Sequence, residues 1–174
     1  DRLYVGAVDL FVSGDGAGTW AQVAHWYGGF GFQNVHADQH IVLYQPGSSN
    51  ICYFGNDGGI YRSGNAAALN PAIDFKGTNY NVTQFYACAM HPTAVTDYFL
   101  AGAQDNGSQQ FTSGGINQTN EVTGGDGAFC HIDQDQPQFQ WTSYVQNSFF
   151  RSSDGGNSFT AASTTGGRFI SPTD

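Results

Sequence analysis

The chain has 174 residues, enough for a sizeable core, and carries a net charge of −9 from 14 acidic and 5 basic residues. So few cations exclude a surface that tracks nucleic-acid phosphates, and they disfavour binding to anionic membranes. No apolar run is long enough to span a bilayer and no signal peptide is apparent, so no membrane insertion is expected. Metal ions and neutral polymers remain as partners.

Aromatic residues make up 15% of the chain, and 24 residues are glycine. This composition, without sustained helical periodicity, favours short strands joined by tight turns. Residues 3–7 and 10–13 are expected to be the first two strands. Three longer runs end in proline, and Pro46, Pro92 and Pro137 recur at intervals of 46 and 45 residues. These runs are 40–46, 85–92 and 128–137.

After each proline a second strand is predicted (51–55, 98–102 and 139–144), then a third (60–63, 110–113 and 149–152). The fourth strands, for example 22–24 and 159–161, are weaker. A period near 45 residues with four strands is typical of a β-propeller blade. The predicted fold is therefore all-β, a propeller sector of about four four-stranded antiparallel blades.

Five segments follow from this repeat. The first contains only strands two to four of a blade and a loop, the next three are whole blades, and a strand at 168–172 begins a fifth blade. Because both ends fall inside blades, we expect a fragment of a larger propeller, completed by the remaining blades of the parent protein or by another chain. The segments are 1–32, 33–80, 81–123, 124–165 and 166–174.

A corner motif occurs twice, at 13–20 and 152–159. It runs Ser, any residue, Asp, a glycine-rich turn, a small hydroxyl residue and an aromatic residue. Aspartate accepts hydrogen bonds from turn amides, glycine supplies positive φ, and the aromatic ring fixes the returning strand. The residues predicted to be structural are Ser13, Asp15, Trp20, Ser152, Asp154, Gly156 and Phe159.

This corner resembles the Asp-box, or BNR repeat, of bacterial propeller proteins. The phrases 56–62, 104–107, 125–127 and 151–156 are similar to those of sortilin-like and xyloglucanase-like propellers. The resemblance implies a secreted or cell-surface bacterial protein, and it is specific for fold rather than function. The corners at Ser63-Gly64-Asn65 and Ser113-Gly114-Gly115 lack the aspartate. Sialidase activity is not expected, because the chain has only four arginines.

In an up-and-down blade, the turns between strands two and three emerge on the same face as the connections that lead into strand one. Asp9, Asp57 and Asp105 lie in such turns, 48 residues apart, and Asp38 and Asp126 precede first strands. Together they predict an acidic mouth, with Asp9, Asp38 and Asp105 as ligand-binding residues. The alternative is plain turn chemistry, which favours aspartate next to glycine.

In xyloglucanases an aspartate in a phrase similar to Asp-Gly-Gly-x-Tyr-Arg is catalytic, and the resemblance assigns that role to Asp57. A glycosidase needs a second carboxylate, about 5–5.5 Å away for retention of configuration or about 6.5–9.5 Å for inversion. Asp126 or Asp105 is the candidate within this chain. In that family the partner comes from a separate propeller domain.

His36, Asp38 and His40 alternate and would share one face of a strand. A metal site there is one interpretation, but on an extended strand the two histidines stand roughly 13 Å apart, too far for one ion without a bulge. Hydrogen bonding is the alternative. No cofactor is firmly predicted. Calcium at an Asp-rich turn stays open, although Asp133-Gln-Asp135 is only a fragment of a calcium loop.

The loop at 26–32 contains Trp26 and Tyr27, which would form a sugar-stacking platform if exposed and ordinary loop packing if buried. Cys52, Cys88 and Cys130 are expected to be buried small residues or to include one disulfide pair. Glycosylation sequons begin at Asn81, Asn106 and Asn117.

Three functions are compatible with the sequence. The first is a module that binds a glycan or protein through the acidic face. The second is part of a xyloglucanase-like glycoside hydrolase. The third is a purely structural segment.

Overall fold

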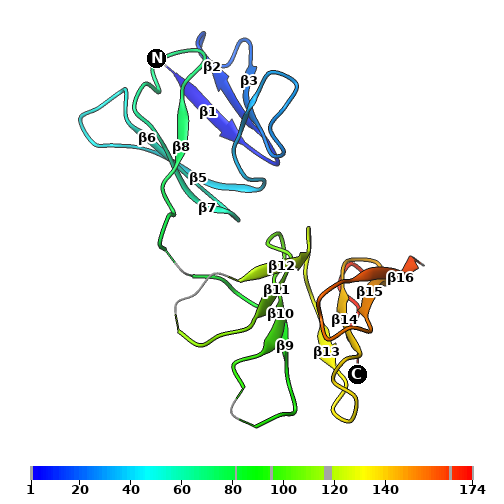
Figure 1. The fold of residues 1–174 in the computed structure, drawn as a ribbon. Coiled ribbons are helices and arrows are strands. Elements are labelled where there is room, and N and C mark those ends of the chain that lie inside the picture. Colours follow the sequence, from blue (N-terminus) through cyan, green and yellow to red (C-terminus); the bar gives the residue numbers. More distant parts are fainter. Residues whose placement is uncertain (1, 81, 95, 116–118, 165, 174) are drawn as a thin grey trace. The chain divides into compact units, whose positions relative to one another are not determined.

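The computed structural model describes residues 2–80, 82–94, 96–115, 119–164 and 166–173 (Figure 1). These residues contain no helix and form four four-stranded sheets. The predicted all-β class and the four-stranded blade are confirmed, and the second, third and fourth sheets have the fully antiparallel build of a propeller blade. Within the same residues, no helix is long and apolar enough to cross a membrane.

The chain divides into two compact units, residues 1–80 and 81–174. Each unit contains two of the sheets, and within each sheet the strands follow one another in chain order. The first unit has β1 (Leu3–Gly6), β2 (Leu10–Ser13), β3 (Ala21–His25) and β4 (Gln33–Asn34), then β5 (Gln39–Tyr44), β6 (Cys52–Asn56), β7 (Gly59–Ser63) and β8 (Ile73–Phe75). The second has β9 (Ala87–Met90), β10 (Phe99–Gly102), β11 (Ser108–Phe111) and β12 (Asn120–Thr123), then β13 (Cys130–Ile132), β14 (Gln140–Ser143), β15 (Ser148–Ser152) and β16 (Thr160–Thr164).

Two details differ from the predicted segments. The short strand β4 pairs in parallel with β3, so the first sheet continues past residue 32. The Gln33 side chain explains this extension, because it donates to Val23 O and Pro71 O and accepts from the amide of Ile73, joining the outer edges of both sheets. Residues 168–172, predicted to be a strand, form bends and loop instead.

Alternating apolar side chains form the core of the first unit. Leu10 and Val12 on β2 are buried against Cys52 and Phe54 on β6. Alternation places these residues on one face of each strand, and burying side chains of this size contributes roughly 1.5–3 kcal/mol each. The two sheets of this unit therefore pack face to face.

The second unit joins its two sheets with a smaller apolar cluster and a polar network. Leu100 on β10 packs with Cys130 and Ile132 on β13. Beside them, the Tyr98 hydroxyl donates to Gln140 Oε1 at 2.8 Å, and Gln110 Nε2 donates to Tyr98 Oη and to Gly156 O, both at 2.8 Å. The network connects the third sheet to the corner of the fourth.

The repeated corners adopt closely similar hydrogen-bonded turns. Ser13 and Ser152 donate to the aspartate two residues later at 2.8 and 2.7 Å. Asp15 accepts from the amide and hydroxyl of Thr19, and Asp154 does so from Ser158. These bonds stabilise the carboxylate form and lower the pKa of both aspartates to about 2.

The corner of the second sheet keeps much of this geometry without an aspartate. Ser63 donates to Asn65 Oδ1 at 3.1 Å, and the amide of Ala72 donates to the same oxygen at 2.8 Å. The neutral amide oxygen thus replaces a carboxylate oxygen. The aromatic residues of the two Asp-containing corners differ, because Phe159 packs against the second core while Trp20 is exposed.

All three cysteines are free thiols. Cys52 and Cys130 are buried and Cys88 is exposed. Burial raises the pKa of Cys52 to about 11 and that of Cys130 to about 12. The expectation of buried small residues therefore fits two of the three.

Candidate functional site

One end of the first unit gathers three connections that are distant in sequence. The amide of Gln39, the first residue of β5, donates to Ala7 O in the β1–β2 turn at 2.8 Å. The Gln39 side chain accepts from Asn56 Nδ2 at 3.3 Å, where β6 leads into the β6–β7 turn. The turns that carry Asp9 and Asp57 therefore both meet the start of β5, next to Asp38.

The Asp9 carboxylate is hydrogen-bonded to residues in and next to β3 of its own sheet. One carboxylate oxygen accepts from the backbone amide of Trp26 at 2.9 Å, and the other accepts from Gln22 Nε2 at 3.0 Å. Sequence reasoning placed Asp9 among the ligand-binding residues. The structure shows both carboxylate oxygens hydrogen-bonded at the base of the aromatic loop, and the role of Asp9 as a ligand contact stays a prediction.

The aromatic loop between β3 and β4 lies on the surface. The rings of Trp26 and Tyr27 lie 3.6 Å apart between centroids, with their planes inclined by 30°. Tyr27 is 75% exposed, Trp26 39% and Phe30 89%. His25 contacts Trp26 and Phe30 from the loop base, at centroid distances of 6.4 and 5.5 Å. Of the two alternatives for this loop, the rings are exposed rather than packed inside.

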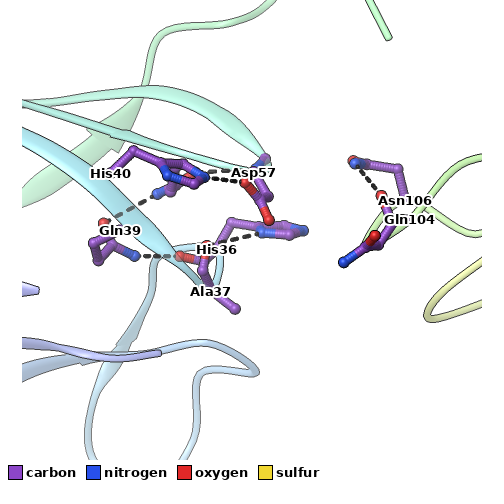
Figure 2. Close-up of polar contacts among 9 residues, drawn as sticks. His36, Ala37, Gln39, His40, Asp57, Gln104 and Asn106 are labelled. Carbon is purple, nitrogen blue, oxygen red and sulfur yellow. Dashed lines mark hydrogen bonds and ion pairs between the residues drawn. The ribbon is translucent and has the colours of Figure 1, made fainter. Parts of the chain in front are cut away.

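His40 and Asp57 form the polar centre of this end (Figure 2). His40 Nε2 contacts a carboxylate oxygen of Asp57, and the two side chains are 67% and 27% exposed. His36 packs over the β6–β7 turn, where a Cβ on Gly58 would overlap its ring. The Gly58 amide donates to Asn56 Oδ1 at 3.1 Å and holds the turn in place. His40 thus contacts the Asp57 carboxylate, and His36 lies against the next residue of the same turn.

Asp38 completes the group from the start of β5. Its φ of +61° is uncommon for a residue other than glycine, and it interrupts the extended backbone before Gln39. A carboxylate oxygen of Asp38 lies within 4.8 Å of one of Asp57. The blade topology predicts that these two aspartates meet on one face, and the positive φ of Asp38 is a local feature that an extended strand does not include.

Coordinating atoms of His36, Asp38 and His40 do not gather within the spacing that one ion requires, in the part of the chain that the structure describes. Hydrogen bonding, the alternative interpretation, fits what surrounds them. His36 O accepts from the Gln39 side chain, and His40 contacts Asp57 (Figure 2). A transition-metal site at these three residues stays a prediction without support from this geometry.

The second unit has an equivalent meeting of turns. The Asp105 amide donates to Asp126 Oδ1 at 3.2 Å, and the Gly107 amide donates to Gly125 O at 2.7 Å. In the same turn, Asn106 Nδ2 donates to Gln104 O at 3.1 Å (Figure 2). Asp57 and Asp126 belong to different units, so their pairing as two catalytic carboxylates stays a prediction.

The remaining predicted residues have local roles or lie outside the described residues. Asp133 accepts from the amides of Asp135 and Gln136, both at 2.9 Å, which is ordinary turn bonding. The sequon residues Asn81 and Asn117 are outside the described residues.

Sequence reasoning missed a groove of 760 Å³ on the fourth sheet. His131 stacks on Trp141 with centroids 4.4 Å apart, and Phe149 meets Trp141 edge-on. Arg151 is paired with Trp141 across neighbouring strands and also lines the groove. Alternate positions of β13, β14 and β15 share this face, which is the signal in the sequence that could have revealed the groove.

No protein-family model and no curated protein matches the chain. It is similar to solved structures of YCF48 from Cyanidioschyzon merolae (13% identity, TM-score 0.36), an ancestral GH74 enzyme (15%, 0.38) and the GH74 xyloglucanase from Xanthomonas campestris (15%, 0.32). These matches cover 92%, 100% and 92% of this chain. The chain spans 65%, 24% and 27% of the length of those proteins.

Proposed function

We propose that the chain is a glycan-binding module, and that the exposed pair of Trp26 and Tyr27 is its contact surface. The exposure of these two adjacent, mutually tilted rings is the observation that carries the proposal. An aromatic face packs against the C–H groups of a sugar ring, and it buries apolar area without needing a charged partner. Most large aromatic residues of a soluble domain are at least partly covered, so an exposed cluster is informative.

The same end of the unit supplies acceptors for sugar hydroxyls. Asp38 and Asp57 lie beside the start of β5, which is hydrogen-bonded to the turn that carries Asp9. Carboxylates accept hydrogen bonds from hydroxyl groups and repel anionic ligands. With a net charge of −9, the ligand is a neutral glycan rather than a uronic-acid-containing or sulfated one.

A glycan array probed with the 174-residue chain tests this function. Trp26→Ala and Tyr27→Ala are expected to lose the neutral-glycan signal, while Tyr80→Ala keeps it. Tyr80 is a suitable control because it is equally solvent-exposed, at 68%, and lies outside the aromatic loop. Equal signals from all four proteins would refute the platform.

A glycoside hydrolase is the second candidate, and the Asp38–Asp57 pair favours it. Their oxygens lie within 4.8 Å, close to the separation of about 5–5.5 Å between carboxyl groups in retaining glycosidases. In this scheme the contact with His40 orients the Asp57 carboxylate. Asp57→Ala is expected to abolish release of reducing sugar from a neutral polysaccharide while the fold is kept, and Asp74→Ala to leave it intact. No release by the unaltered chain removes this candidate.

The setting that we propose is a secreted or cell-surface propeller with further blades. Leu3 and Val5 on β1 are 44% and 47% exposed, and Trp141 on β14 lines the groove of the fourth sheet. Exposed apolar sheet faces favour association. If instead no glycan and no substrate interacts with the chain, the purely structural role is the account that remains.

A further inference from the structure

Side chains from outside the aromatic loop hold both backbone polar groups of Trp26. Its amide donates to Asp9 Oδ1 at 2.9 Å, and its carbonyl accepts from Asn34 Nδ2 at 2.6 Å. Asp9 belongs to the β1–β2 turn and Asn34 to β4. Trp26, the first aromatic residue of the platform, is therefore hydrogen-bonded from two sides.

The loop needs these external hydrogen bonds because its own backbone can adopt many conformations. Gly28, Gly29, Phe30 and Gly31 all have positive φ. Glycine loses more conformational entropy on ordering than any other residue, so a loop of this kind is costly to fix. Three bonds inside the loop oppose that cost in the described structure, from the amides of Gly28 and Phe32 to His25 O and Gly29 O, both at 2.8 Å, and from the Tyr27 amide to His25 Nδ1 at 3.2 Å.

Asp9 is itself fixed. Its second carboxylate oxygen accepts from Gln22 Nε2, which also donates to Ala24 O at 3.0 Å. Its carbonyl accepts from the Ala7 amide at 3.0 Å, and Ala7 O accepts from Gln39 at the start of β5. The turn thus links the platform to the strand that carries His40 and follows Asp38.

We propose that Asp9 is a positioning residue, which holds Trp26 and Tyr27 in the orientation that binds glycan and does not itself contact the ligand. The inference rests on the proposed function. A surface that is ordered before binding loses little conformational entropy when the ligand binds. Loss of the hydrogen bond between Asp9 and Trp26 is therefore expected to weaken the affinity. Asparagine retains the acceptor that Trp26 needs, whereas alanine does not.

The test measures affinity for a neutral oligosaccharide from the array, together with the Trp26 indole N–H resonance, assigned by its disappearance in Trp26→Phe. Asp9→Ala is expected to bind about tenfold more weakly, as loss of a hydrogen bond to a charged group predicts. Asp9→Asn is expected to bind within about threefold of the unaltered chain, since the amide bond survives. Asp74→Ala, which removes another exposed acid of the same unit, changes neither readout.

The outcomes distinguish the positioning role of Asp9 from the proposed glycan binding. Undiminished affinity and an unchanged indole resonance in Asp9→Ala would overturn the positioning role even if Trp26→Ala abolishes binding. If the unaltered chain binds no glycan, the proposed function fails, and the indole resonance still decides whether Asp9 orders the loop. If Asp9→Ala does not fold, Asn34→Ala removes the hydrogen bond on the other side of Trp26. That variant is expected to shift the indole resonance and to weaken binding. An unchanged resonance and affinity in Asn34→Ala would contradict the inference.

Discussion

The Tyr98 hydroxyl donates to Gln140 Oε1 at 2.8 Å and so connects the third sheet to the fourth. Gln110 Nε2 donates to the same hydroxyl oxygen, and Gln140 Nε2 donates to Pro137 O at 3.0 Å. Both glutamine side chains are buried. The hydroxyl therefore satisfies one buried acceptor and one buried donor at the junction of two blades.

Removing that hydroxyl is expected to destabilise the second unit. Tyr98→Phe leaves Gln140 Oε1 without this donor, which costs about 1–2 kcal/mol. For a chain of this size each kcal/mol corresponds to a change in Tm of about 2–4 °C. Tyr80→Phe, at an exposed ring outside the network, is the control. Equal Tm values for the two variants would show that the network contributes no net stability.

Acid is expected to weaken the two Asp-containing corners. Hydrogen bonds from Ser158 and Ser152 lower the pKa of Asp154 to about 2, and those from Thr19 and Ser13 do the same for Asp15. A carboxylate whose pKa is depressed in the folded state contributes stability above its unfolded pKa, near 4. That contribution is lost as the pH falls from about 4 to about 2.

Asp154→Asn tests this expectation, because Asn65 shows that an amide oxygen fits such a corner. The variant is expected to be less stable at neutral pH and to lose less stability between pH 4 and pH 2. The measurement is urea denaturation at several pH values. An identical dependence on pH in both proteins would contradict the assignment.

Thiol reactivity is expected to follow burial. Cys88 is exposed, whereas burial raises the pKa of the Cys52 and Cys130 thiols to about 11 and 12. Since the thiolate is the reactive form, a maleimide at pH 7.5 should label Cys88 alone until denaturant is added. Mass spectrometry of the labelled peptides gives the answer. Rapid labelling of Cys130 in the folded chain would mean that β13 is not packed against β10.

Much of the fold could be predicted because local rules and repeat spacing agreed. The prolines at 46, 92 and 137 marked first strands, and the Ser-x-Asp corners adopt the predicted turn bonds. The bends at 168–172 could not be foreseen, because an apolar run does not reveal whether a pairing partner is present. The corner at Asn65 lacks the aspartate, as the sequence showed, but its amide oxygen retains the contact.

The candidate site was harder to predict for a specific physical reason. Blade topology was enough to predict that Asp38 and Asp57 meet on one face, but not the positive φ of Asp38, because residues 36–40 were taken as an extended strand. For Asp9, turn position alone does not show where the carboxylate points, and its role as a ligand contact stays a prediction. Its bond to the Trp26 amide depends on the path of a glycine-rich loop, which composition does not specify.

Calorimetric titration of the chain with a neutral oligosaccharide tests the central claim most directly. We expect saturable binding, an affinity reduced about tenfold or more in Tyr27→Ala, as the loss of about 1.5–3 kcal/mol of apolar burial implies, and no change in Tyr80→Ala. Binding of equal strength in Tyr27→Ala and the unaltered chain would contradict it.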